Sequence, residues 1–196
     1  PSLVGSEMCI RDSPNAASIE NLAREVKDNG GVYIVPAFSG LFAPYWRPDA
    51  RGVIVGLTRF ANRKHLARAV LESTAYQTRD VADAMVADSG VEITELRVDG
   101  GMTMNELLMQ FQSDILGVEV HRPKNIETTA TGAAFAAGLD HGFWDDLSVL
   151  GSQTGDMKVF KPKRDKEEVE GLYRDWKRAI KRSLEWEDNE DEDLNI

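Results

Sequence analysis

The stretch RVDGGMTMNELLMQFQ, residues 97–112, constrains the fold more than any other part of the chain. It begins as the end of a strand, turns on two glycines and continues as a helix without internal Pro or Gly. Thr103 and Glu106 have the T-x-x-E spacing of a capping box, which predicts a helix start at about residue 104. A strand, a glycine turn and a helix in this order indicate an α/β protein.

The spacing of apolar residues continues this order on both sides of the turn. Alternating or β-branched runs predict strands, and spacings of three and four predict helices. The order of elements therefore predicts an α/β fold. Strands are expected at 32–38, 93–98 and 118–123 with a short extended piece at 53–57, and helices at 16–27 with Ser18 as a plausible cap, 63–87, 104–116, 127–142 and 166–186.

The longest expected helix, residues 63–87, should be capped by Asn62 and ended by Ser89-Gly90. Its inward stripe includes two polar residues, which need hydrogen-bond partners if they are buried. The expected stripe is Leu66, Val70, Thr74, Gln77, Val81 and Met85.

Two further segments carry expectations about packing. The Ala- and Gly-rich helix at 127–142 has small side chains that allow close approach, so we expect it to be buried. The loop at 39–52 contains two Gly, two Pro, a Tyr and a Trp. We expect this loop to pack on the body of the protein, with the lining of a site as the alternative.

Composition excludes several classes of protein. The net charge is −10, and EWEDNEDED at 185–193 supplies seven acids and no base, so a basic nucleic-acid footprint is absent. No apolar run reaches the ~18 residues of a membrane span. One cysteine and three histidines make a zinc site of usual spacing improbable, and the single cysteine fits the reducing cytoplasm.

Residues 1–13 are expected to be non-native or disordered, and residues 187–196 are expected to form a disordered acidic tail.

The glycine turn has the chemistry of a possible nucleotide site. It lacks the G-x-G-x-x-G pattern and the Lys of a P-loop. Gly101, however, allows a flat ring or a ribose to lie against the backbone, and Asn105 offers both a donor and an acceptor. The alternative is a tight turn with a surface Asn. No pattern of a catalytic set is present.

One stretch resembles a family signature. GVIVGLTRFANRKHLARAVLE, residues 52–72, resembles the second signature of the FGGY carbohydrate kinases. The matching positions are Gly52, Ile54, Gly56, Leu57, His65, Leu66, Ala69, Val70, Leu71 and Glu72.

Within that family, VPAFSGLFAPYW (35–46) and VDGGMTMNELLMQFQSDILG (98–117) resemble the members that phosphorylate glycerol. The resemblance implies an actin-like, ribonuclease-H-like fold, with residues 14–186 forming an incomplete carboxy-terminal domain. It implies ATP with Mg²⁺, glycerol as substrate and a missing amino-terminal domain as partner, and leaves a homo-oligomer possible. It assigns nucleotide contacts to Gly101 and Asn105.

The same resemblance implies what lies outside this chain. The general base, the glycerol-binding residues and the phosphate loop are expected upstream, so the chain should be inactive alone. Two alternatives stay open: a sister kinase acting on a pentulose or another polyol, and a non-catalytic nucleotide-binding relative. The upstream residues would separate all three.

Overall fold

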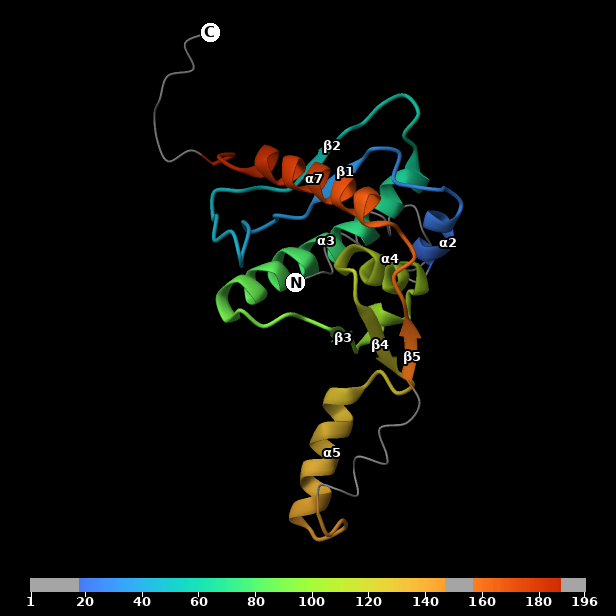
Figure 1. The fold of residues 1–196 in the computed structure, drawn as a ribbon, viewed down its shortest axis with the longest axis vertical. Coiled ribbons are helices and arrows are strands. Elements are labelled where there is room, and N and C mark those ends of the chain that lie inside the picture. Colours follow the sequence, from blue (N-terminus) through green and yellow to red (C-terminus); the bar gives the residue numbers. More distant parts are fainter. Residues whose placement is uncertain (1–17, 147–156, 188–196) are drawn as a thin grey trace. The chain divides into compact units, whose positions relative to one another are not determined.

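The computed structural model describes residues 18–146 and 157–187 (Figure 1). The predicted start at 1–13 lies outside these residues, as does the predicted tail at 187–196 apart from Glu187. The chain divides into two compact units, one formed by Pro1–Glu92 with Arg164–Ile196 and the other by Ile93–Lys163. No helix in the described ranges has the length and apolar character to cross a membrane.

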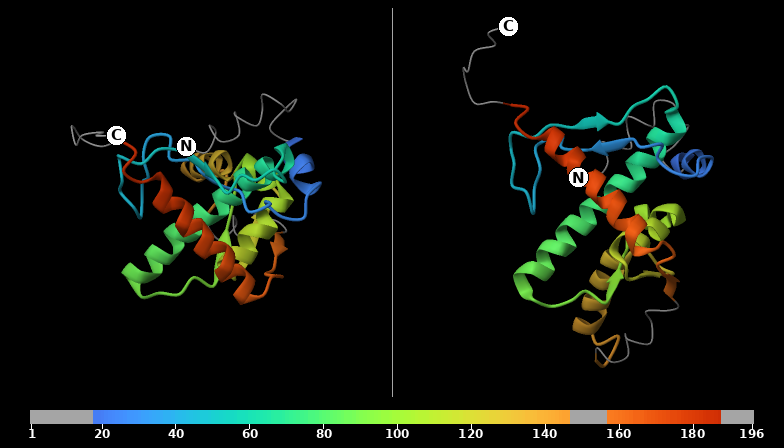
Figure 2. Two further views of the ribbon diagram at one scale, coloured as in Figure 1. Left: turned by 90° about the horizontal axis from the view of Figure 1, so that it is seen from above. Right: turned by 45° about the horizontal axis from the view of Figure 1, so that its top comes forward.

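Among its described residues, the first unit packs three helices with a β-hairpin (Figure 2). Strands β1 (Tyr33–Val35) and β2 (Val53–Val55) are antiparallel, with Ile34 opposite Ile54. Helices α3 and α7 both contact β1, whose three residues are buried, and α2 packs on α3. The helices are α2 (Ser18–Arg24), α3 (Arg63–Ser89) and α7 (Lys166–Ser183).

The second unit is built on a three-stranded sheet with the order β3-β4-β5. Strand β3 runs parallel to β4, and β5 runs antiparallel to it, so the buried Val120 lies between Leu96 and Phe160. Helix α4 contacts both β4 and β5. The elements are β3 (Glu95–Arg97), the 3₁₀ turn η1 (Gly101–Met104), α4 (Glu106–Leu116), β4 (Glu119–Pro123), α5 (Thr128–Asp140) and β5 (Met157–Phe160).

Both predicted ends of the long helix are confirmed. The Asn62 side chain accepts from the Lys64 N–H, and His65 Nδ1 accepts from the Asn62 N–H. Gly90 ends the helix in the left-handed conformation, at φ 69°. A further prediction, that Ser18 caps the first helix, is wrong because Ser18 is already helical.

The inward stripe predicted for α3 is wrong in its second half. Val81 and Met85 are 39% and 59% exposed. The buried face lies beside the expected stripe and carries Arg68, Glu72 and Asp80. The apolar pattern could not reveal this face because its charged residues are buried as partners of other polar groups: Arg68 Nε donates to Glu72 Oε1 at 2.8 Å. Burial raises the pKa of Glu72, and Arg68 partly offsets that effect.

Asp80 joins α3 to α7 inside the first unit. Its carboxylate accepts hydrogen bonds from the Tyr173 hydroxyl at 2.6 Å and the Trp176 indole N–H at 2.7 Å. Lys177 Nζ lies 3.2 Å from the same carboxylate and donates to the Tyr45 hydroxyl at 2.8 Å. The network therefore fixes Tyr45, and with it the loop at 39–52, to α7.

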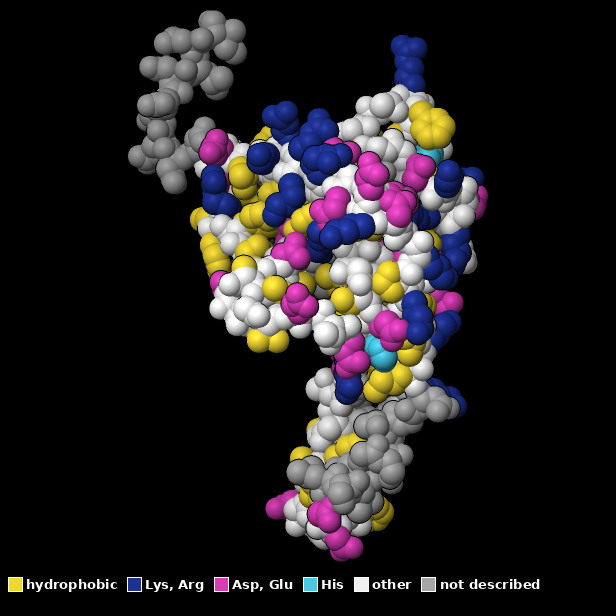
Figure 3. Space-filling view, in the orientation of Figure 1, with side chains coloured by type: hydrophobic (Ala, Val, Ile, Leu, Met, Phe, Trp, Pro, Cys, Tyr) yellow, Lys and Arg dark blue, Asp and Glu magenta, His cyan; other side chains and the backbone are white. Residues whose placement is uncertain are grey.

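The expectation that the aromatic loop packs on the body is confirmed for Leu41, Tyr45 and Ala50 but not for two of its aromatic rings. Phe42 and Trp46 are 67% and 70% exposed. The backbone groups of Leu41 and Arg47 pair with each other at 2.8 Å, and the left-handed φ of Trp46, 51°, lies within the reversal. The short reversal holds these rings outward, and Figure 3 shows hydrophobic side chains at the surface there.

The two remaining helices differ from expectation in opposite ways. Helix α7 is amphipathic as predicted, with Val169, Trp176 and Ile180 buried, but ends at Ser183 rather than 186. Figure 3 shows its outer face carrying basic and acidic side chains together. Helix α5 was expected to be buried, and none of its residues is. Small side chains permit close packing but do not by themselves supply the neighbouring element.

Candidate nucleotide turn

The glycine turn begins at the end of β3 and leads into α4. Gly100 has a φ of 86°, which favours glycine, and its carbonyl accepts the Thr103 hydroxyl at 2.7 Å. The capping box predicted for Thr103 and Glu106 is therefore wrong, because the Thr103 hydroxyl closes the 3₁₀ turn. The cap is Asn105, whose Oδ1 accepts from the Leu108 N–H at 2.9 Å, and α4 begins one residue later at Glu106.

Gly101 presents open backbone. It is exposed, its φ lies outside the left-handed region, and a Cβ built on it would meet no atom within 4 Å in the described structure. The fold itself therefore requires glycine at position 100 and not at 101. The missing side chain at 101 leaves room for an external group to approach the backbone.

Asn105 has one polar group committed to the fold. Its Oδ1 accepts the Leu108 N–H, so the acceptor serves as the helix cap. The side-chain nitrogen carries two donor hydrogens. Since Asn105 is half-exposed, a ligand at this turn would meet a hydrogen-bond donor. The sequence left donor and acceptor equally available.

Neighbouring segments brace the turn. The Gly100 N–H donates to the Ile126 carbonyl at 2.9 Å, and the Val98 N–H donates to the His121 carbonyl at 3.0 Å. The carboxylate of Asp99 accepts the hydroxyl of Thr128, the first residue of α5. Asp99 thus has a hydrogen-bond partner at the start of α5.

A hollow of about 330 Å³ adjoins the turn at Met104. Sequence reasoning missed this feature because strand β5, which supplies part of its wall, is only four residues long and was not expected. Among the described residues, no group of three or more His, Cys, Asp or Glu side chains is placed to hold a metal ion. The hollow is lined by Met104, Arg122, Pro123, Lys124, Met157 and Lys158.

The signature at 52–72 has a different role in the structure. Gly56 has a φ of 80°, and a Cβ there would lie 2.0 Å from the Gly31 carbonyl oxygen. His65 completes the cap of α3, and Glu72 lies buried against Arg68. Leu66, Ala69 and Val70 of the same signature pack with Val32 and Ile34, so the stretch serves as a scaffold in this structure.

Comparison with known proteins identifies the family of the chain. Residues 6–140 match the C-terminal domain of the FGGY family of carbohydrate kinases. The chain is 69% identical over 179 residues to a glycerol kinase of Corynebacterium kroppenstedtii, covering 91% of this chain and 35% of that relative. It is 64% identical over 176 residues to a glycerol kinase of Pseudarthrobacter chlorophenolicus, covering 90% and 35%. The chain therefore spans about a third of the length of these relatives.

Solved structures show the same likeness. A Plasmodium falciparum glycerol kinase with ADP superposes with a TM-score of 0.83 at 35% identity, covering 93% of this chain and 37% of that one. A xylulose kinase of Rhodospirillum rubrum gives 0.72 at 26% identity, covering 92% and 37%. The expected α/β fold of actin-like type is confirmed. Because the match to the carboxy-terminal domain of the family spans well over half of the residues, the chain belongs to the FGGY family of carbohydrate kinases.

Proposed function

We propose that the parent of this chain transfers the γ-phosphoryl group of ATP to glycerol, and that this chain supplies part of the adenosine side of the cleft. The observation that carries the proposal is the turn at 100–105, where open backbone at Gly101 precedes a donor at Asn105. The turn stands in a chain 69% identical to a glycerol kinase. The family match does not identify the substrate, and the 69% identity to a glycerol kinase is what favours glycerol.

The residues of this chain would bind and orient the nucleotide. Gly101 lets the flat adenosine end lie against the backbone, and Asn105 donates a hydrogen bond from its capped position. The nucleotide supplies the phosphoryl group, and catalysis in such transfers rests largely on positioning and electrostatics. The base, the glycerol contacts and the groups for Mg²⁺ belong upstream, so we expect no turnover from residues 1–196 alone. A cytoplasmic location and a homo-oligomeric parent remain predictions.

Two other functions compete with this proposal. A sister kinase for a pentulose would share the fold, but the glycerol kinase structure is nearer in identity and TM-score than the xylulose kinase structure. A non-catalytic relative would bind nucleotide without transferring phosphate. The presence or loss of the upstream general base decides that case.

The test uses a hybrid enzyme in which residues 14–196 replace the matching segment of the Corynebacterium kroppenstedtii glycerol kinase. Asn105→Asp keeps a good helix cap but removes the donor and adds a negative charge. Asn105→Ala removes both the cap and the donor. Gly101→Val places a branched side chain over the open backbone. Steady-state kinetics with ATP and glycerol varied in turn, together with melting temperatures, separate stability from binding.

We expect Asn105→Asp to raise the KM for ATP roughly two- to tenfold, the factor for one hydrogen bond, with the melting temperature almost unchanged. Asn105→Ala should raise the KM similarly and also lower stability by about 1 kcal/mol. Gly101→Val should weaken ATP binding and leave the KM for glycerol nearly constant. An unchanged ATP dependence in Asn105→Asp and Gly101→Val would show that the turn does not bind the nucleotide. Phosphorylation of a pentulose in preference to glycerol would refute the substrate assignment.

A further inference from the structure

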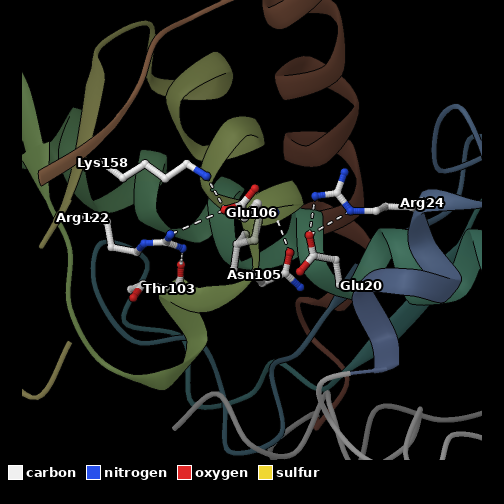
Figure 4. A network of polar contacts seen from close by, with 8 residues as sticks. Glu20, Arg24, Thr103, Asn105, Glu106, Arg122 and Lys158 are labelled. Atoms are coloured by element: carbon white, nitrogen blue, oxygen red, sulfur yellow. Dashed lines mark hydrogen bonds and ion pairs between the residues drawn. The ribbon is translucent and has the colours of Figure 1, made fainter. Parts of the chain in front are cut away.

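Arg122, at the end of β4, contacts the backbone of the nucleotide turn at Thr103 (Figure 4). Its Nη1 donates to the carbonyl oxygen of Thr103 at 2.7 Å, and its Nη2 lies 3.6 Å from a carboxylate oxygen of Glu106. These two partners stand on either side of Asn105 in the sequence: Thr103 belongs to η1, and Glu106 is the first residue of α4. One planar guanidinium therefore spans the step from the turn to the helix.

The guanidinium is itself well fixed. The Arg122 side chain is only 11% exposed, and its charged end lies 5.5 Å from the centre of the Phe160 ring on β5. Phe160 is buried, at 6% exposure. A guanidinium that packs on an aromatic face has little freedom to rotate, so it can hold the nucleotide turn in a fixed position on the sheet.

The Thr103 carbonyl matters because it is the point at which Arg122 contacts the backbone between Gly101 and Asn105. The Thr103 N–H and hydroxyl both bond to Gly100, inside the turn. The bond to Arg122 links the turn to the sheet. A shift of this carbonyl would rotate the following peptides and move the Asn105 side chain away from its capped position.

We infer that Arg122 is a positioning residue for the nucleotide, which fixes the backbone of residues 101–105 so that Asn105 presents its donor in one direction. The inference rests on the proposed function. Arg122 acts on the nucleotide only through the turn. Arginine suits this role because its planar guanidinium holds its donors in a rigid fork, whereas the three donors of a lysine ammonium rotate at the end of a flexible stem.

Lys158 provides a matched control. It also forms an ion pair with Glu106, and it also lies near the Phe160 ring, at 5.3 Å from its centre. Arg122 has in addition the bond to the Thr103 carbonyl. Arg122→Gln and Lys158→Gln each remove one cation from Glu106, so the comparison controls for the loss of that ion pair.

The experiment is a kinetic comparison in the same hybrid enzyme. We expect Arg122→Gln to raise the KM for ATP about five- to tenfold, and Arg122→Lys to raise it nearly as much. Lys158→Gln should change it less than twofold. The KM for glycerol should stay constant in all three, and the two Gln variants should have melting temperatures that agree within about 2 °C.

A double-mutant cycle tests whether Arg122 acts through Asn105. If it does, Arg122→Gln should change the KM for ATP less than twofold in an Asn105→Asp background, because the donor that it positions is already gone. Full additivity, a normal KM for ATP in Arg122→Lys, or equal effects of Arg122→Gln and Lys158→Gln would each overturn the inference. The proposed nucleotide site is judged separately: it fails if Asn105→Asp and Gly101→Val leave ATP dependence unchanged, whatever Arg122 does.

Discussion

The carboxylate of Asp80 should be among the most costly polar groups to alter in the first unit. Its side chain is 1% exposed, and it accepts hydrogen bonds from Tyr173 and Trp176 at 2.6 and 2.7 Å. Asp80→Asn keeps the shape but turns one acceptor into a donor, which then faces another donor in either orientation of the amide. Lys177 is 43% exposed, so its loss as an ion-pair partner adds little. We therefore expect a loss of about 2–4 kcal/mol in the free energy of unfolding.

The assay is urea unfolding of the 196-residue chain, followed by thermal melting. The expected loss corresponds to a fall in melting temperature of roughly 5–15 °C for a chain of this size. Asp83→Asn is the control, since Asp83 lies one turn further along α3 with a side chain 55% exposed, 3.5 Å from Arg79. A loss below ~0.5 kcal/mol for Asp80→Asn, or one equal to that of Asp83→Asn, would show that the buried network does not carry stability as argued.

Two other predictions concern the hairpin and its surroundings. The Arg47 side chain and then the Glu185 N–H hold the pKa of Asp49 below its usual range, so the stability from this carboxylate should be present above the ordinary pKa of about 3.9 and be lost as pH falls. The urea midpoints of the chain and its Asp49→Asn variant should therefore differ at pH 7 and converge towards pH 3; a difference that grows on acidification would contradict the sign. Gly56→Ala should cost about 3 kcal/mol or more, because its Cβ would lie 2.0 Å from the Gly31 carbonyl oxygen. Gly90→Ala, with φ +69° and open space around it, should cost only about 1 kcal/mol in the same melting experiment, and equal losses would remove the steric explanation.

The sequence predicted element types better than it predicted faces. The ends of α3 were predictable because Asn62 and Gly90 act locally, within one turn of the helix. Its buried face was not, because Asp80 is buried by partners on α7, more than 90 residues away. A pattern that counts apolar residues assigns such a carboxylate to the surface. The same limit applies to Arg68 and Glu72, which are buried as a pair.

The turn was located correctly from sequence, but its internal hydrogen bonds were not. T-x-x-E spacing is a valid cap signal, yet Asn105 lies between the two residues and is an equally good cap. Asn105 is the cap in the structure because the Thr103 hydroxyl is bonded to the Gly100 carbonyl within the 3₁₀ turn. Arg122 could not have been found in this way, since its contact with Thr103 depends on the pairing of β4 with β3 and β5.

The scaffold and the candidate site depend on different residues, which lie in different units of the chain. The signature at 52–72 lies in the first unit, where Gly56, His65 and Glu72 stabilise the hairpin and α3. The turn at 100–105 lies in the second unit and depends on Gly100, Asn105 and the support of Arg122. A relative could therefore keep the signature and the fold while losing the donor at the position of Asn105. Membership of the family follows from the match over residues 6–140, whereas nucleotide binding by this chain must be judged on the residues of the turn.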